Sequence, residues 1–248
     1  TKRGSAPNTM DVTIEVKEKP TGSFQVGAGF STVESFVAQA QISQNNLFGR
    51  GQTLSFQGNF SAIRSIANIR FYEPYFLDSR VNFGLNLYRF ENVYADFTRE
   101  SYGGDLTLGY PLSDDWGVSS TYTLEEVAIR SGGFSGSSAN DTRLSIYGKG
   151  VTSSLRLSVY YDTRNNRLFP TDGVYANSSV EHAPDFLLSE NRFTRYRLQG
   201  RYYYGLGLGV VAKVRGEWGL IYGHDNTGVP LFERFFVGGP LTVRGFER

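Results

Sequence analysis

Hydrophobic and polar residues alternate along most of this chain with a period of two. Such alternation is typical of β-strands that have one apolar and one polar face. No apolar run approaches the roughly 18 residues that a membrane-spanning helix needs. The pattern predicts an all-β fold with eleven strands, over residues 24–30, 36–42, 53–60, 67–71, 81–87, 105–110, 116–129, 155–161, 174–180, 195–204 and 210–220.

A twelfth alternating stretch, residues 10–19, differs in character because charged residues rather than aromatic ones separate its apolar positions. Pro20 and Gly22 break the pattern after it. We interpret residues 1–20 as the end of a preceding soluble domain and residues 21–248 as the N-terminal part of a β-barrel. Because Arg248 falls within a segment rich in glycine and aromatic residues, we expect the chain to be a piece of a longer protein.

Strand length and polarity favour a transmembrane antiparallel β-barrel over a soluble β-sandwich, which also shows alternation. The predicted strands reach about 9–16 residues, as membrane strands do, whereas strands of soluble sheets usually have about 5–6. Charged residues in the middle of the polar faces suit a water-filled lumen. Aromatic residues near the strand ends suit two interfacial girdles: Phe30, Tyr72, Tyr88, Phe90, Tyr110, Tyr161, Tyr204 and Tyr222.

The connections between strands fall into two alternating kinds. One kind is rich in Asn, Pro, Gly and Asp, at residues 43–51, 73–79, 111–115, 162–173 and 205–208. The other kind comprises residues 31–35, 61–65, 91–98, 130–142, 182–191 and 223 onward. In bacterial barrels short turns face the periplasm and longer loops face outward, so the chain is expected to start in the periplasm.

Composition narrows the functional classes. The chain has no cysteine, which excludes disulfide frameworks and cysteine-based zinc sites, and its net charge of +1 does not favour nucleic acid. No catalytic, metal-binding or cofactor-binding set is evident, so we do not expect an enzyme. The two histidines, His182 and His224, are interpreted as solvated loop residues. The basic row Arg195, Arg197 and Arg201 is expected to line the lumen opposite carboxylates such as Glu217.

The last segment of the chain contains Gly238-Gly239-Pro240 followed by Val243-Arg244-Gly245-Phe246. This pair of motifs resembles the BamA superfamily of outer-membrane protein assembly factors. Sequences similar to the strands and turns of this superfamily also occur at residues 9–24, 27–31, 46–51, 73–76 and 161–173. The resemblance therefore covers nearly the whole chain. It implies that residues 1–20 end the last POTRA domain and that eleven of about sixteen strands precede the Arg-Gly-Phe loop, called loop 6.

The resemblance implies that the protein folds β-barrel precursors and inserts them into the outer membrane of Gram-negative bacteria. Its partners would be unfolded outer-membrane protein precursors, outer-membrane lipids and lipopolysaccharide, and accessory assembly lipoproteins, without nucleic acid or cofactor. Templating would take place at a lateral gate formed by the first barrel strand, namely Phe24, Val26, Gly27, Ala28, Gly29 and Phe30. In the family, loop 6 folds back into the lumen. The resemblance therefore implies that the loop 6 residues of this chain lie in the lumen, namely Val243, Arg244, Gly245 and Phe246.

A buried Arg244 needs carboxylate partners. Asp105, Asp162 and Glu217 are the lumen-facing candidates, although the resemblance puts the main partners on strands after loop 6. Alternative functions are a TamA-like or two-partner-secretion transporter of the same superfamily, or a passive porin. The number of POTRA domains would separate the superfamily members.

Overall fold

The computed structural model describes residues 2–3, 10–11, 14–15, 19–32, 34–93, 97–131, 149–224 and 228–235. Eleven strands in these ranges form one antiparallel sheet, in which every strand pairs with its neighbours in the chain. The prediction of eleven strands is therefore confirmed. The strands are β3 (Gly22–Ser31), β4 (Ser35–Leu47), β5 (Gln52–Phe60), β6 (Arg64–Glu73), β7 (Asn82–Val93), β8 (Phe97–Pro111), β9 (Trp116–Ser131), β10 (Lys149–Asp162), β11 (Gly173–Ala183), β12 (Phe193–Gly207) and β13 (Val210–Gly223).

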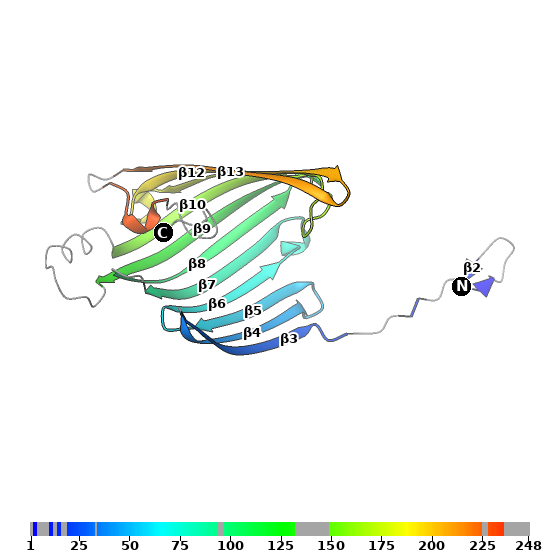
Figure 1. Cartoon of the computed structure of the whole chain (residues 1–248), viewed down its shortest axis with the longest axis horizontal. Helices are drawn as coiled ribbons and strands as arrows, with labels where there is room; N and C mark the ends of the chain where they lie inside the picture. The colour runs from blue at the N-terminus through cyan, green and yellow to red at the C-terminus, as the bar shows by residue number, and fades with distance from the viewer. Residues whose placement is uncertain are drawn as a thin grey trace.

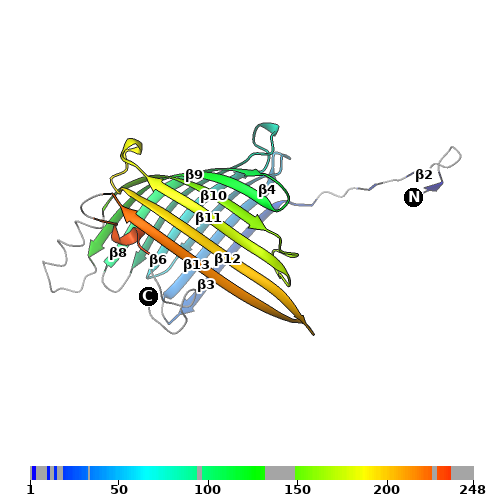
Figure 2. The same ribbon diagram turned by 90° about the horizontal axis from the view of Figure 1, so that it is seen from above.

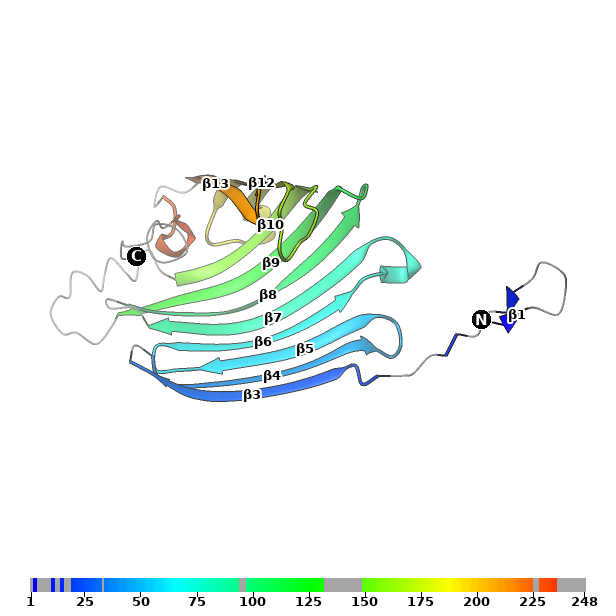
Figure 3. The same ribbon diagram turned by 45° about the vertical axis from the view of Figure 1, so that its right-hand side comes forward.

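The sheet is strongly curved, from β3 at its lower edge to β12 and β13 at its upper edge (Figures 1 and 3). Figure 2, seen from above, shows the long strands running obliquely across the sheet. Strand lengths of 9 residues in β5 to 16 in β9 match the expected membrane strands. No helix in the described ranges has the length and hydropathy needed to cross a membrane.

The described connections lie at two opposite rims, as the alternation of connection types predicts (Figure 1). We call the end with the turns after β4, β6, β8, β10 and β12 the turn rim, and the opposite end the loop rim. The chain enters β3 at the turn rim, where Gly22 pairs with Gln44. β4 extends to Leu47, into the turn expected over 43–51, because Ser43, Gln44 and Asn45 remain paired with β5.

The distribution of apolar residues is inverted relative to a soluble sheet. Apolar side chains on one face of the sheet are exposed, for example Phe30 at 80% and Leu157 at 57%. Among the described residues, the buried set contains more polar or charged than hydrophobic members, including Ser154 and Glu181. An apolar outer face around a polar interior is the arrangement of a barrel that faces lipid.

The segment before the sheet is described only in part. β1 (Lys2–Arg3) pairs with β2 (Met10–Asp11) in a separate two-stranded sheet. Within the strand expected over residues 10–19, Ile14 and Glu15 lie outside any strand, and Ile14 is 80% exposed. The expectation of a half-buried strand is wrong there, because no described element covers Ile14.

Candidate functional site

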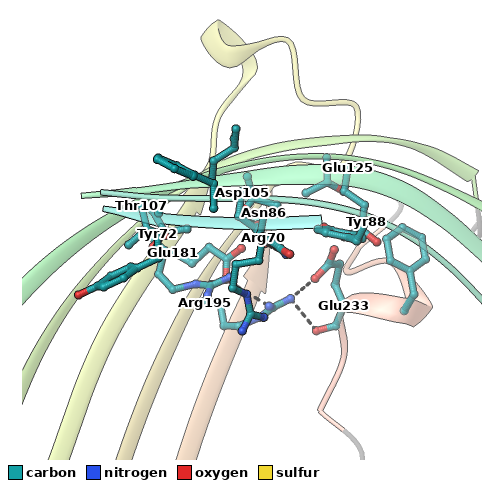
Figure 4. A pocket seen from close by; sticks show the side chains of 18 of the residues that line it. Arg70, Tyr72, Asn86, Tyr88, Asp105, Thr107, Glu125, Glu181, Arg195 and Glu233 are labelled. Atoms are coloured by element: carbon teal, nitrogen blue, oxygen red, sulfur yellow. Dashed lines mark hydrogen bonds and ion pairs between the residues drawn. The ribbon is translucent and has the colours of Figure 1, made fainter. Parts of the chain in front are cut away.

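The polar face of the sheet encloses a cavity of about 590 Å³. Its wall is lined mainly by side chains of β6 to β12, and a short 3-10 helix, η3 (Leu231–Glu233), closes one side. Charged, polar and aromatic side chains from several strands point into it (Figure 4). They include Arg70, Tyr72, Asn86, Tyr88, Asp105, Thr107, Glu125, Glu181, Arg195 and Glu233.

Arg195 of β12 is the centre of a buried ion-pair network. Its Nη1 lies 3.2 Å from a carboxylate oxygen of Glu181, and its Nη2 donates to the carboxylate of Glu233 and, at 3.0 Å, to that residue's backbone oxygen. Glu181 also accepts hydrogen bonds from Arg156 at 3.2 Å and from the Ser154 hydroxyl at 2.9 Å. The side chains of Arg195, Glu181 and Glu233 are only 13%, 7% and 10% exposed. Charges held this far from water require such partners.

A second ion pair lies beside the first. Arg99 of β8 contacts Glu125 of β9 through an Nη2–Oε1 distance of 3.2 Å. The Arg99 guanidinium lies 4.7 Å from the ring centre of Phe90 and 5.6 Å from that of Phe232. These distances fall within the range of cation–π attraction. Phe232 therefore connects the end of the described chain to strands in the middle of the sheet.

Residues 228–235, which we call the return segment, run from the loop rim into this cavity. In addition to Phe232 and Glu233, Phe235 of this segment makes a close contact with the sheet. A Cβ atom added to Gly219 of β13 would lie 2.5 Å from Cζ of Phe235, so the missing side chain of Gly219 leaves the space for that ring. Arg197 lies 5.5 Å from the same ring centre. The return segment is thus held by β8, β12 and β13.

Among the residues of the basic row, the structure confirms Glu217 as a partner of Arg197 and corrects the partners of Arg195. Arg195 pairs with Glu181 and Glu233 rather than with Glu217. Arg197 lies 4.0 Å from Glu217, a weak contact between half-exposed groups. Arg201 stands directly opposite Arg215, and its buried Nε has no hydrogen-bond partner among the described residues.

Sequence reasoning missed Glu181 and Glu233. The strand register places Glu181 directly opposite Arg195, so an exact hairpin register would have identified that pair. Nothing in the alternation pattern identifies Glu233, because it lies beyond the last strand.

The carboxylates considered for Arg244 already have partners. Asp105 accepts hydrogen bonds from Asn86 and Thr123 at 3.2 and 2.8 Å. Asp162 receives two bonds of 2.8 Å from Arg164, a pairing that raises the pKa of the Arg164 side chain. Glu217 lies 3.2 Å from Arg215. The proposed loop 6 residues Val243, Arg244, Gly245 and Phe246 lie outside the described residues, so their position stays a prediction.

The expected gate strand is β3, which contains all six residues assigned to it. Phe24, Val26 and Phe30 project from one face and are 69%, 67% and 80% exposed, while Gly27 and Gly29 face the other way. In the described sheet β3 pairs with β4 alone. β3 and β13 are thus the two outer strands of this part of the barrel, and the role of β3 as a gate stays a prediction.

Comparison with known proteins agrees with this architecture. The chain is 25% identical over 242 residues to the outer membrane protein assembly factor BamA of Nitratidesulfovibrio vulgaris, which aligns 96% of this chain with 30% of that protein. It is 26% identical over 250 residues to a SAM50-like protein of Drosophila melanogaster, with 98% of this chain and 56% of that protein aligned. The chain thus spans well under two thirds of these curated relatives.

A solved structure supports the fold. The crystal structure of BamA from Haemophilus ducreyi lacking POTRA domains 1–3 superposes with a TM-score of 0.72 at 23% identity, covering 93% of this chain and 47% of that one. Residues 46–248 match the Omp85 superfamily domain, which is most of the chain. The chain therefore belongs to the Omp85 superfamily, and its eleven-stranded sheet is part of a transmembrane β-barrel.

Proposed function

We propose that this chain is the first part of the barrel of an assembly factor that folds β-barrel precursors and inserts them into the bacterial outer membrane. The observation that carries the proposal is an antiparallel sheet with an apolar outer face and a polar inner face, in a chain whose residues 46–248 match the Omp85 superfamily domain. The curated relatives support it, because they are named as an assembly factor and as a SAM50-like protein. The protein makes and breaks no covalent bonds in this role.

The edge of β3 is suited to templating. An incoming precursor strand pairs with exposed backbone groups by β-augmentation, which supplies affinity without a fixed side-chain sequence. β3 lacks side-chain packing at Gly29, where a Cβ would meet no atom within 4 Å, whereas the space beside Gly27 is filled by the Gln39 side chain. Glycines inside a strand reduce packing and increase the entropy lost on ordering. A precursor strand could thus pair with the edge of β3 that does not face β4, at low energetic cost.

The proposal assigns partners and an orientation. The clients are unfolded outer-membrane protein precursors, the surroundings are outer-membrane lipids and lipopolysaccharide, and accessory lipoproteins assist. Residues 1–20 end the last POTRA domain and lie in the periplasm, so the turn rim is periplasmic. The match to the Omp85 superfamily domain supports this function over that of a passive porin.

A photo-crosslinking experiment tests the gate. A photoreactive phenylalanine analogue is placed at Phe24 or Phe30 of β3 in the full-length protein, and irradiated cells are examined for adducts with newly made outer-membrane proteins. Leu157 of β10 provides the matched control, because it is 57% exposed on a strand that is paired on both sides. We expect client adducts at both β3 positions and at least tenfold fewer at Leu157. Equal yields at the three positions would rule out β3 as the template.

Cysteine labelling in intact cells tests the orientation. A cysteine at Ser135, in the connection between β9 and β10, should react with a membrane-impermeant maleimide. A cysteine at Leu168, an 83%-exposed residue in the turn between β10 and β11, should react only after the outer membrane is permeabilised. The reverse pattern would place the turn rim outside the cell and contradict the proposed topology.

A further inference from the structure

The two histidines of the chain meet at one point, although they are far apart in the sequence. His182 lies near the end of β11, and His224 directly follows β13. Nδ1 of His182 is 2.8 Å and Nε2 of His224 is 2.7 Å from the same hydroxyl oxygen, Oγ1 of Thr194 on β12. The two ring centres are 5.7 Å apart and the rings are nearly perpendicular, at 80°. Both side chains are exposed, as the sequence analysis expects, but His182 belongs to β11 rather than to a loop, and the two rings share a hydrogen-bond partner.

The sheet itself fixes this arrangement. Thr194 pairs with His182 in the register of β11 and β12, and with Tyr222 in the register of β12 and β13. The backbone N–H of His224 donates to the Arg192 carbonyl at 3.0 Å, which holds His224 beside β12. His182, Thr194 and His224 are all exposed or half-buried at the loop rim, so burial does not force the rings together.

The three groups can form a complete hydrogen-bonding set around the Thr194 hydroxyl. A threonine hydroxyl has one proton, so it donates to one imidazole and must accept from a ring N–H of the other. Two imidazole nitrogens directed at one point also form half of the ligand set of a tetrahedral transition metal. Zinc–nitrogen bonds are about 2.0–2.1 Å, so small side-chain rotations would bring both nitrogens into range.

We propose that His182 and His224 chelate one divalent transition-metal ion in the position now bridged by the Thr194 hydroxyl. Imidazole ligands favour Cu²⁺, Ni²⁺ and Zn²⁺ over Mg²⁺ or Ca²⁺, and Cu²⁺ should bind most tightly. Within the described ranges no three His, Cys, Asp or Glu side chains gather as a metal site, so His182 and His224 are the two ligands that the proposal names. The bound ion would clamp β11 to the chain directly before the return segment.

Metal titration of the full-length protein tests the proposal. The protein is purified in detergent without an affinity tag, stripped with a chelator, and titrated calorimetrically with CuCl₂, NiCl₂ and ZnCl₂. Histidines elsewhere in the longer protein contribute equally to every variant, so the comparison between variants carries the result. We expect His182→Ala and His224→Ala each to weaken binding at the tightest site at least tenfold, and the double variant to resemble either single one.

A control variant separates chelation from hydrogen bonding. Thr194→Val removes the bridging hydroxyl but leaves both imidazoles, so it should retain tight Cu²⁺ binding. Heat-dependent gel mobility confirms that each variant is folded. Cu²⁺ should raise the unfolding temperature of the wild type and Thr194→Val, but not of the single histidine variants. Unchanged Cu²⁺ binding in both histidine variants would show that His182, Thr194 and His224 are hydrogen-bonded but bind no metal ion. This result would overturn the proposal.

Discussion

Arg195→Ala in the full-length protein is expected to destabilise the folded barrel by about 3–5 kcal/mol, because it leaves two buried carboxylates without their shared partner. Glu181 retains Arg156, but Glu233 loses both its carboxylate and its backbone contact. Unfolding in guanidinium chloride and heat-dependent gel mobility measure the loss. Arg195→Lys should recover part of it, since lysine supplies charge without the two-pronged geometry of a guanidinium.

Arg197→Ala is the matched control for that experiment. Arg197 occupies the same face of β12 two residues further on, but it is 47% exposed and 4.0 Å from Glu217. Exposed pairs of this kind contribute about 0–1 kcal/mol. Adding Glu233→Gln to Arg195→Ala should restore stability relative to Arg195→Ala alone, because it removes one of the unpaired charges. Wild-type stability of Arg195→Ala would show that the network does not hold the return segment.

Gly219→Ala is expected to dislodge Phe235 and reduce barrel stability and, under the proposed function, client assembly. The new methyl group would lie 2.5 Å from the phenylalanine ring. Overpacking in a core costs about 1–3 kcal/mol, and because Phe235 is 37% exposed and its ring can move aside, we expect a cost of about 1 kcal/mol. The levels of outer-membrane proteins in cells depleted of the wild-type protein report assembly. The same substitution at Gly216 should have little effect, because a Cβ added at that position of the same strand would meet no atom within 4 Å.

A compensating substitution makes this second prediction specific. Phe235→Ala removes the ring that collides with the new methyl group, so Gly219→Ala combined with Phe235→Ala should be more stable than Gly219→Ala alone. Residues in direct contact show such non-additive effects. If the two effects simply add, Gly219 does not act by accommodating Phe235.

The strands were predictable because a membrane barrel imposes a simple constraint on every strand. Leu155, Leu157 and Val159 face lipid while Arg156 and Ser158 face the interior, and the period of two follows directly. Strand ends were less predictable. At Ser43–Asn45 both faces are polar near the turn rim, so the alternation fades while the backbone pairing with β5 continues.

The interior contacts were only partly predictable for a different reason. Periodicity assigned Arg195 to the lumen but not its partners, which depend on the exact register and on a segment outside the strand pattern. Glu233 lies in a 3-10 helix that follows the last strand, where no period constrains its position. The alternation pattern also could not predict that His182 and His224 lie close together, since β12 lies between β11 and β13 in the sheet.

The neighbour-to-neighbour order of the sheet also bears on how the barrel forms. Each strand pairs with the one that precedes it in the chain, so hairpins close short loops, which is kinetically favourable. The contact of Phe232 with Arg99 is different, because it joins residues far apart in the sequence and forms after the intervening strands. Interactions made after the transition state mainly slow unfolding. We therefore expect the contacts of the return segment to set the lifetime of the folded barrel more than the speed of its formation.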